Sequence, residues 1–500
     1  MQRKSKRWAH LFSGITILLL LVAGCTRTDP VAEPKPRFEG VELRVASPAG
    51  TPATVLEQYG APWARREGCS LKVTIYAADT GPAPLPVGAD VWVVRPCELP
   101  HWAAAGRLRP VPEELRSRES YGWVNLLPLY RDKLGVWDRV GYGLPLLGEG
   151  PVCFYRTDLL GGADNRDAFA AATKGKLGPP ATWEDFAAIA EFFHGRKGPG
   201  PGGASLPPLP ADDQELDREF YWVAAPCARR ALSEGEAGGG EREVFSFHYD
   251  LATGAPRVDT PGFVHALELL QRLQAFRPAG TDSEPPAAFA RGEAVLCVAD
   301  AFWVARFQKS AVRGKFGVCR LPGSGTVYSY NGDETGTVTG GNFVPYLGAG
   351  GWLAVVPRDA PHPEVAWGLL EELSGPEISR QIVIEPAWGG GVCRRDQFEP
   401  RDLLSFGLDQ AQTKTLAESL RRTLAHVGVK NPVVRLRTPD EAPHRKAMTE
   451  EVRAALQKGG DAKKALERAA QRWRELDRGR DARARLADYY LSLSLQPPRS

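Results

Sequence analysis

The first part of the chain alternates apolar and polar residues in the manner of β-strands. Residues 41–45 place valine or leucine at every second position, and residues 71–75 repeat this period. A segment of helical length, residues 53–67, separates the two. Residues 90–94 are mostly apolar, which is typical of a strand buried on both faces of a parallel sheet. This β-α-β order predicts an α/β domain.

Four later segments carry the helical period, with apolar residues at positions i, i+3, i+4 and i+7. The spacing predicts helices over residues 182–193, 260–270, 363–373 and 461–473. Thr182, with Asp185 three positions later, is expected to cap the first of them, and Asp461 the last. We interpret the apolar stripes as core.

Two segments interrupt this order. Residues 195–240 are crowded with glycine and proline, and residues 323–341 are rich in glycine, serine and threonine, so both are predicted to be surface insertions. Asp212 and Asp213 lie in the first insertion, where adjacent carboxylates are more typical of a solvated turn than of an acid–base pair. The polar residues after 478 are expected to form a frayed or loosely docked tail.

The N-terminus carries a targeting pattern. Cationic side chains within residues 3–7 precede an apolar run at 15–23, which is too short to span a bilayer, since this takes about 20 apolar residues. Leu-Val-Ala-Gly-Cys at 21–25 resembles the cleavage site of a bacterial lipoprotein signal peptide. The resemblance implies that residues 1–24 are removed and that Cys25 takes the lipid. Residues 25–37 would then tether the fold to the periplasmic or extracytoplasmic face of a membrane. A secretory signal with an incidental cysteine is the alternative.

Composition excludes several function classes. The 500 residues carry a formal charge of +3, and removal of the four cations before Cys25 leaves −1, so the basic footprint of a nucleic-acid-binding protein is absent. Seven cysteines follow Cys25 without a C-x-x-C pair, which argues against structural zinc and leaves one or two disulfides open. The P-loop, metalloprotease and α/β-hydrolase motifs are missing. We therefore predict a non-enzymatic protein without metal or cofactor.

Four segments, in this order, resemble the extracellular solute-binding proteins of ABC importers, in particular the sugar-binding class that includes maltodextrin-binding proteins. They begin with Ala-Asp-Val-Trp-Val-Val at 89–94, Tyr-Gly-Leu-Pro-Leu-Leu-Gly-Glu at 142–149, Ala-Phe-Ala-Arg-Gly-Glu-Ala-Val at 288–295 and Gly-Gly-Trp-Leu-Ala-Val at 350–355. No single segment is decisive, but their order and spacing together are specific.

The resemblance implies an α/β fold of the two-lobe, type II periplasmic-binding-protein kind. The ligand cleft lies between the lobes, which hinge strands join and which close around the ligand. Lobe one is expected at residues 38–147 plus 323–388 and lobe two at 148–322 plus 389–477, with a tail at 478–500. The three crossings between lobes are expected near 146–150, 320–323 and 388–394.

The resemblance also nominates cleft residues. Glu149 matches a carboxylate near the hinge that accepts hydrogen bonds from sugar hydroxyls, and Trp303 matches an aromatic platform for a sugar ring. Trp352 and Trp388 stand at glycine-rich turns that face the cleft in this family. Tyr155 points either to the cleft or into the core. Large aromatic side chains are most often core residues, so packing is the alternative for each.

The first segment departs from the maltodextrin-binding pattern. Val94, Cys97 and Glu98 stand where those proteins carry Trp, Asp and Arg, so these sugar contacts are lost. If Arg95 faces the cleft, its guanidinium can donate two hydrogen bonds to an anionic group. Otherwise it is a surface arginine. The departure favours a different sugar or a ligand outside carbohydrates.

These features predict a lipid-anchored, monomeric receptor in the cell envelope. It is expected to capture a small polar ligand, above all a saccharide, and to deliver it to the permease subunits of an ABC-type importer. A sensor or adaptor lipoprotein without a transport role is the alternative function. The sequence does not separate the two.

Overall fold

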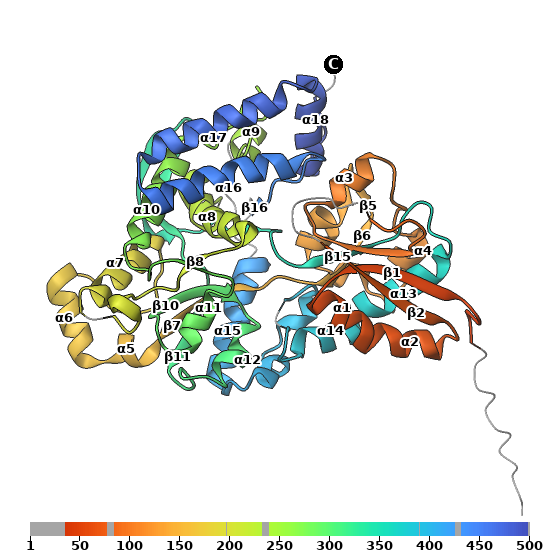
Figure 1. Ribbon diagram of the computed structural model, residues 1–500, viewed down its shortest axis with the longest axis horizontal. Helices are drawn as coiled ribbons and strands as arrows, with labels where there is room; N and C mark the ends of the chain where they lie inside the picture. Colours follow the sequence, from red (N-terminus) through yellow and green to blue (C-terminus); the bar gives the residue numbers. More distant parts are fainter. Residues whose placement is uncertain are drawn as a thin grey trace, which may run out of the picture.

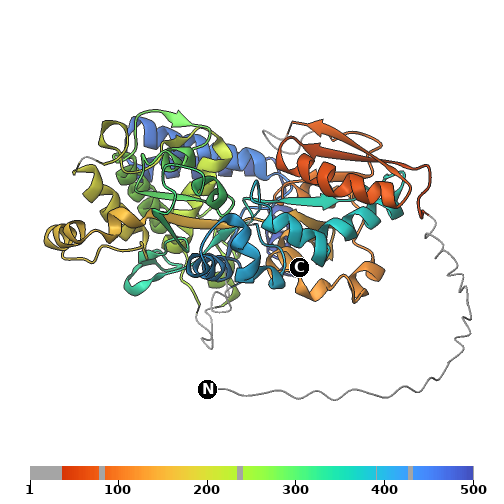
Figure 2. The ribbon, with the colours of Figure 1, turned by 90° about the horizontal axis from the view of Figure 1, so that it is seen from below.

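Two α/β lobes lie side by side in the molecule (Figures 1 and 2). The computed structural model describes residues 36–77, 85–196, 198–232, 240–389, 391–425 and 432–498. The predicted signal peptide, Cys25 and most of the predicted tether lie outside these residues.

Lobe one is built on a five-stranded mixed sheet with the order β2-β1-β3-β15-β6. β1 pairs in parallel with β2 and β3, which confirms the predicted β-α-β opening, whereas β15 runs antiparallel to β3 and β6. β3 is buried along its whole length, as its apolar sequence predicts. The strands are β1 (Glu42–Pro48), β2 (Ser70–Tyr76), β3 (Val91–Val94), β6 (Gly143–Leu147) and β15 (Trp352–Val355), with a hairpin of β4 (Val136–Trp137) and β5 (Val140–Gly141).

Short helices cover the lobe-one sheet. The predicted helix over 53–67 is present as α1, one π-helical turn and α2, and α13 packs against α2 and β6 to close the core. The helices are α1 (Thr51–Val55), α2 (Ala61–Arg66), α3 (Leu99–Ala104), α4 (Glu113–Ser117), α13 (Pro363–Ser374) and α14 (Pro376–Ile384).

Lobe two is mainly helical around a small antiparallel sheet with the order β10-β7-β11. Its strands are β7 (Pro151–Arg156), β8 (Leu209–Pro210), β9 (Thr281–Asp282), β10 (Leu296–Asp300), β11 (Phe316–Cys319), β12 (Ser324–Tyr328) and β13 (Glu334–Asn342). Its helices are α5 (Thr157–Gly161), α6 (Ala163–Thr173), α7 (Trp183–His194), α8 (Asp213–Ala228), α9 (Glu241–Phe245), α10 (Pro261–Gln274), α11 (Pro286–Ala290), α12 (Trp303–Phe307), α15 (Gln410–Leu424), α16 (Glu441–Lys458), α17 (Ala462–Asp477) and α18 (Ala482–Ser492).

The predicted helices form where the apolar period and the capping residues indicate. α7, α10, α13 and α17 each bury the stripe assigned to the core. Thr182 and Asp185 form a reciprocal capping box at α7, and Asp461 caps α17 by accepting a hydrogen bond from the Lys464 amide. These four predictions are confirmed.

The prediction that residues 195–240 form a surface insertion is wrong for its central part. Residues 213–228 form α8, which buries Leu216, Phe220 and Val223 in the lobe-two core and packs against α10 and α16. Asp212 starts this helix by accepting hydrogen bonds from the amides of Gln214 and Glu215. The neighbouring glycines and prolines belong to the loops around a core helix.

Residues 323–342 also differ from the expectation, which placed them in lobe one. They form the hairpin β12–β13, and β12 packs against α7, α8 and α10 of lobe two. Glu184 of α7 holds the hairpin, because its carboxylate accepts hydrogen bonds from the Ser324 hydroxyl and the Gly325 amide. The chain therefore re-enters lobe one only at residues 348–351, directly before β15.

The C-terminal residues are not a loose tail. Asp481 caps α18, and Tyr489 and Tyr490 on this helix are buried against lobe two. The Tyr489 hydroxyl accepts hydrogen bonds from the amides of Phe247 and His248, at 3.3 and 3.2 Å. In Figure 1 α16, α17 and α18 (blue) lie together over lobe two.

Glycines bring two crossing strands into contact. A Cβ atom on Gly148 would clash with the carbonyl of Gly391, and one on Gly391 would clash with Gly148. The first crossing, at 148–150, and the third, at 391–393, therefore lie against each other at a distance that only glycine allows. Leu127 of lobe one donates from its amide to the carbonyl of Cys393, which fixes the third crossing to lobe one.

Arg437 ties the C-terminal segment to lobe one. Its fully buried guanidinium donates to the carbonyls of Lys133, Leu134 and Val136 at 2.8–3.0 Å, and to Pro96 at 3.2 Å. Nearby, β16 (Val433–Val434) pairs in parallel with β14 (Tyr346–Leu347), just before the second crossing. We refer to residues 432–438 as the C-terminal strap, because this segment connects both lobes in addition to the three crossings.

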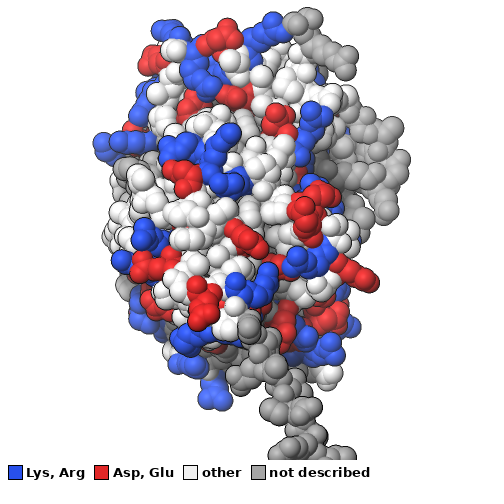
Figure 3. Space-filling view, turned by 90° about the vertical axis from the view of Figure 1, so that its right-hand side faces the viewer, with Lys and Arg blue, Asp and Glu red and all other residues white. Residues whose placement is uncertain are grey.

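Charge is mixed on the lobe-one end of the molecule, which faces the viewer in Figure 3. Among the described residues, no helix combines the length and hydrophobicity needed to cross a membrane. In the same part of the chain, no three histidine, cysteine, aspartate or glutamate side chains gather as a metal site requires. The seven cysteines after Cys25 all lie within the described residues, and none forms a disulfide.

Replacing the strap arginine should destabilise the fold. We expect Arg437→Met to lower the free energy of unfolding by about 3–5 kcal/mol, because several buried carbonyls lose their donor. Chemical denaturation measures this change. Arg483→Met, which removes an exposed arginine from α18, is the control and should change stability by less than about 0.5 kcal/mol. Equal stability of the two variants would contradict the role given to Arg437.

Candidate ligand-binding site

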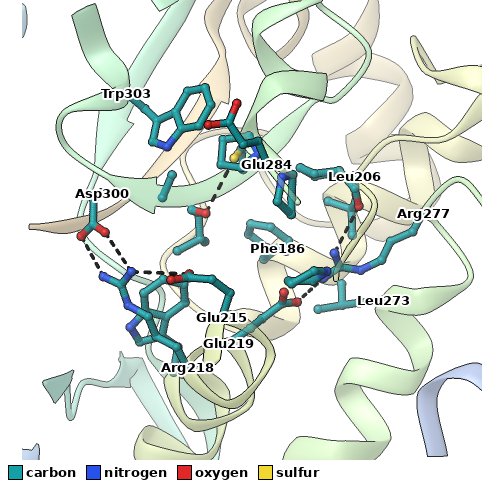
Figure 4. A pocket seen from close by; sticks show the side chains of 18 of the residues that line it. Phe186, Leu206, Glu215, Arg218, Glu219, Leu273, Arg277, Glu284, Asp300 and Trp303 are labelled. Atoms are coloured by element: carbon teal, nitrogen blue, oxygen red, sulfur yellow. Dashed lines mark hydrogen bonds and ion pairs between the residues drawn. The ribbon is translucent and has the colours of Figure 1, made fainter. Parts of the chain in front are cut away.

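A pocket of about 290 Å³ opens in lobe two beside the first crossing. It lies between α7, α8 and α10 on one side and β10, α11 and α12 on the other, and all of its lining residues belong to lobe two. Figure 4 shows charged side chains around this pocket and apolar side chains in its middle. We call the first group the rim and the second the floor.

The rim is built from ion pairs. Arg218 of α8 holds Asp300, the last residue of β10, by two hydrogen bonds of 2.7 and 2.8 Å. Arg277 pairs with Glu219 and also donates to the carbonyls of Pro207 and Pro208, each at 3.1 Å. Glu284 pairs with Arg306 of α12 at 3.2 Å. The rim therefore carries strong hydrogen-bonding groups while its paired charges offset one another.

The floor consists of five side chains, which are buried and lie on three helices and one loop. They are Trp183 and Phe186 of α7, Leu206, Trp222 of α8 and Leu273 of α10. Phe186 lies in the middle of the view in Figure 4, between the labelled rim residues. Aromatic and aliphatic surface of this kind is typical of small-molecule sites.

Arg218 and Asp300 are the central pair. Burial alone would raise the pKa of Asp300, but Arg218 outweighs burial and holds this pKa below its ordinary value. Burial likewise opposes the charge of Arg218, yet Asp300 and Glu215 raise its pKa above the ordinary value. Asp300 also accepts a hydrogen bond from the Gly150 amide at 3.0 Å. The pair is therefore ionised and joins the pocket to the first crossing.

Trp303 lies on the pocket wall, across from Glu215 and Arg218 in Figure 4. Its ring is 7% exposed, and the guanidinium of Arg306 covers it at 4.5 Å from the ring centre. Trp303 therefore offers only a small part of its surface to a ligand rather than a fully open platform.

Glu149 does not face the pocket, contrary to the role that the resemblance gives it. The side chain is 2% exposed, and its carboxylate accepts hydrogen bonds from the amides of Gly348 and Gly350, at 2.5 and 3.2 Å. Burial raises its pKa to about 7, against the opposing effects of Arg218 and the two amides. Glu149 thus anchors the second crossing and has no free oxygen for a sugar hydroxyl.

Arg95 and Trp352 lie together on lobe one. The Arg95 guanidinium stacks on the Trp352 ring at 4.5 Å, at the edge of the sheet where β3 ends and β15 begins. The positive charge of Arg95 reaches across to Glu215 of lobe two, where it opposes the rise in pKa that burial and Asp300 produce. Glu215 keeps about half of its side chain exposed. Neither Arg95 nor Trp352 lines the pocket, and the charge of Arg95 indicates only that this edge of lobe one lies toward Glu215.

Tyr155 and Trp388 are packing residues. Tyr155 lies on β7, against the backbone of Gly317 on β11, and packs on the lobe-two core. Trp388 is half-buried against the lobe-one core, and neither side chain lines the pocket. Their proposed cleft roles are not supported by this geometry.

The sequence interpretation missed Arg218, Glu215, Trp222 and Asp300. The first three lie on α8, in the segment interpreted as a surface insertion. A signal was present, because Asp212 is a capping residue and Leu216, Phe220 and Val223 follow with helical spacing. Asp300 is the last residue of a mostly buried strand, a place where polar side chains commonly reach a site.

Comparison with known proteins agrees with this architecture. Residues 76–391 match the sequence profile of a family described as bacterial extracellular solute-binding protein. No curated protein sequence is similar enough to count as a match.

Solved structures of such proteins share the fold. An ABC transporter solute-binding protein from Agrobacterium radiobacter K84, in complex with ribitol, superposes with a TM-score of 0.62 at 18% identity, covering 88% of this chain and 100% of that one. The sugar-binding protein MalE from Xanthomonas citri gives 0.60 at 17%, covering 88% and 100%. A substrate-binding protein of Listeria monocytogenes in complex with cycloalternan gives 0.61 at 15%, covering 87% and 99%. These similarities confirm the predicted two-lobe, type II periplasmic-binding-protein fold.

The buried Glu149 should make stability depend on pH. Its pKa of about 7 in the fold lies above the ordinary value of 4.5, so the folded state holds a proton that the unfolded chain has lost. The contribution of Glu149 to the free energy of unfolding should therefore fall by about 3 kcal/mol as the pH rises from about 4.5 to 7. Denaturation across this range should show a flatter profile for Glu149→Gln than for the wild type.

A second buried carboxylate affects the same pH range, and an exposed carboxylate serves as the control. Glu98 is buried with a pKa also raised to about 7, so the test is the difference between wild type and variant rather than the wild-type slope alone. Glu57→Gln, at an exposed carboxylate of lobe one, should leave the profile unchanged. Parallel profiles for wild type and Glu149→Gln would show that Glu149 does not titrate in this window.

Proposed function

Because the chain belongs to the bacterial extracellular solute-binding proteins, we propose that it captures a sugar or polyol outside the cytoplasm for an ABC-type importer. It acts as a monomeric receptor and not as an enzyme. The ligand lies at the mouth of the lobe-two pocket, against the Arg218–Asp300 pair and the Trp303 ring, and lobe one covers it with Arg95 and Trp352.

The Arg218–Asp300 pair carries this proposal. A neutral hydroxyl can accept from the guanidinium and donate to the carboxylate, so an ion pair already matched in charge suits a neutral ligand rich in hydroxyl groups. Trp303 adds the apolar surface that the C–H groups of a sugar or polyol require. Ligands without matching hydroxyls would leave these desolvated groups unpaired, which is the basis of selection.

Structural relatives support the ligand class. The Agrobacterium protein described above is in complex with ribitol, and the Xanthomonas protein is a sugar-binding protein. Because their identity to this chain is below 20%, the argument for the ligand rests on the chemistry of the rim and not on transfer from these relatives.

We propose further that Cys25 carries a lipid that holds the protein at the membrane. The support is the lipobox-like sequence at 21–25 and the short apolar run before it. A receptor held near the permease would deliver its ligand over a short distance.

Ligand binding is testable on a form that begins after Cys25. A screen of free sugars and polyols by tryptophan fluorescence and thermal shift should find a ligand that adds about 2.7 kcal/mol of stability at 100 times its Kd. Trp303→Ala should then weaken binding about tenfold or more. Trp367→Ala, at a half-buried tryptophan of α13 outside the pocket, should not. Unchanged affinity in Trp303→Ala would rule out this site, and no ligand at all would favour the sensor or adaptor alternative.

Lipidation is testable in a bacterial host. The full-length wild type should incorporate labelled palmitate and fractionate with membranes, because its acyl chains partition into the bilayer. Cys25→Ala should be unlabelled and released, whereas Cys69→Ala should remain labelled, since Cys69 is buried in lobe one. Labelling of Cys25→Ala would contradict the assignment.

A further inference from the structure

We propose that the ligand is amphipathic: a sugar or polyol that carries a short alkyl or aryl substituent, whose apolar part enters the floor of the lobe-two pocket. This inference rests on the proposed function and adds to it a second subsite of different chemistry.

The floor cannot satisfy a hydroxyl-rich group. Leucine and phenylalanine have no polar side-chain atoms, and tryptophan has a donor but no acceptor. Trp183 Nε1 already donates to the carbonyl of Trp222 at 3.1 Å, which leaves Trp222 Nε1 as the donor without a partner among the described residues. The floor side chains therefore offer no acceptor to a ligand, and their one unpartnered donor is itself buried.

Hydroxyl groups placed on this surface would lose their hydrogen bonds to water without replacement. Each loss costs about 1–3 kcal/mol, whereas burial of apolar ligand surface gains about 25 cal/mol per Å². The balance excludes a second sugar ring from the floor and favours an alkyl or aryl group.

The rim and the floor divide the pocket by chemistry. Arg218, Asp300 and Glu215 lie at the mouth beside the first crossing, and the Arg277–Glu219 pair stands on the other side of the floor (Figure 4). Arg277 is committed to Glu219 and two proline carbonyls, so the hydroxyl-binding side chains that remain all belong to the rim, with Asp300 and Glu215 on one side and Ser283 and Glu284 on the other. A ligand with hydroxyls at one end and carbon at the other matches this division.

The size of the pocket sets a limit on the substituent. About 290 Å³ is at the lower end of the range of about 300–1,000 Å³ typical of small-molecule sites. One sugar ring at the mouth with one short substituent on the floor suits this volume. A long oligosaccharide would have to extend out of the pocket.

Titration calorimetry on the form that begins after Cys25 tests the inference. The probes are the free sugar, the methyl glycoside, the hexyl glycoside and the phenyl glycoside of glucose, galactose and mannose, with ribitol and mannitol as polyols and phenol and 1-hexanol as substituents alone. In at least one sugar series, the hexyl or phenyl glycoside should bind about tenfold or more tightly than the methyl glycoside. Its binding heat capacity should also be more negative, which marks burial of apolar surface.

Two matched variants on α10 separate the floor from general packing. Leu273 lines the pocket, whereas Leu267 is buried on the same helix outside it. Leu273→Ala should reduce the gain from the substituent at least threefold. Leu267→Ala should retain the full gain, and circular dichroism confirms that both variants are folded.

The outcomes distinguish this inference from the proposed function. If free sugars, polyols or methyl glycosides bind but the substituent adds nothing, the inference is wrong and the proposed function stands. If none of the sugar, polyol or glycoside probes binds, the proposed function fails and the inference with it. If phenol or 1-hexanol alone binds as tightly as the glycoside, the rim contributes nothing and both are overturned.

Discussion

The bidentate pair between Arg218 and Asp300 is the contact on which the arrangement of lobe two depends. It joins α8 to the end of β10 and, through the Gly150 amide, to the first crossing between the lobes. Removing two charges from water is costly, and the cost is offset only when geometry and additional hydrogen bonds are good. Here the guanidinium also stacks on Trp222 at 4.5 Å. Core, pocket and hinge are therefore fixed by one buried interaction.

The crossings obey a second constraint, which is space. Gly148 and Gly391 let two strands approach at a distance that no side chain permits. Glu149, which lies between the lobes, accepts hydrogen bonds from the amides of Gly348 and Gly350, just before β15. The carboxylate of Glu149, next to the hinge, therefore has a structural role. The proposed ligand contacts lie instead on α8, β10 and α12, which are rigid elements of lobe two.

Local sequence signals predicted the elements better than the site. Alternation and capping residues correctly located β1, β2, β3 and α7, because these depend on neighbours in the chain. The prediction for α8 was wrong because glycine-rich loops flank this helix. The whole segment was interpreted as a loop, although α8 has its own helical period of apolar residues. Glu149 was placed near the hinge correctly, but the direction of its side chain depends on the amides of residues 348 and 350, which are distant in sequence. Arg218 and Asp300 are 82 residues apart, so only the fold brings them together.

The C-terminal strap changes what the two lobes can do. Arg437 binds four carbonyls of lobe one, while α16 and α18, which follow it in the sequence, pack on lobe two. Lys133 of lobe one adds a hydrogen bond to the carbonyl of Leu493, next to α18. Ties at this point as well as at the crossings restrain the lobes, so we infer that they do not separate widely when the ligand is absent. The affinity is then not reduced by a large population of open states that cannot bind the ligand. We expect the ligand to enter and leave through small, fast movements rather than through full separation of the lobes.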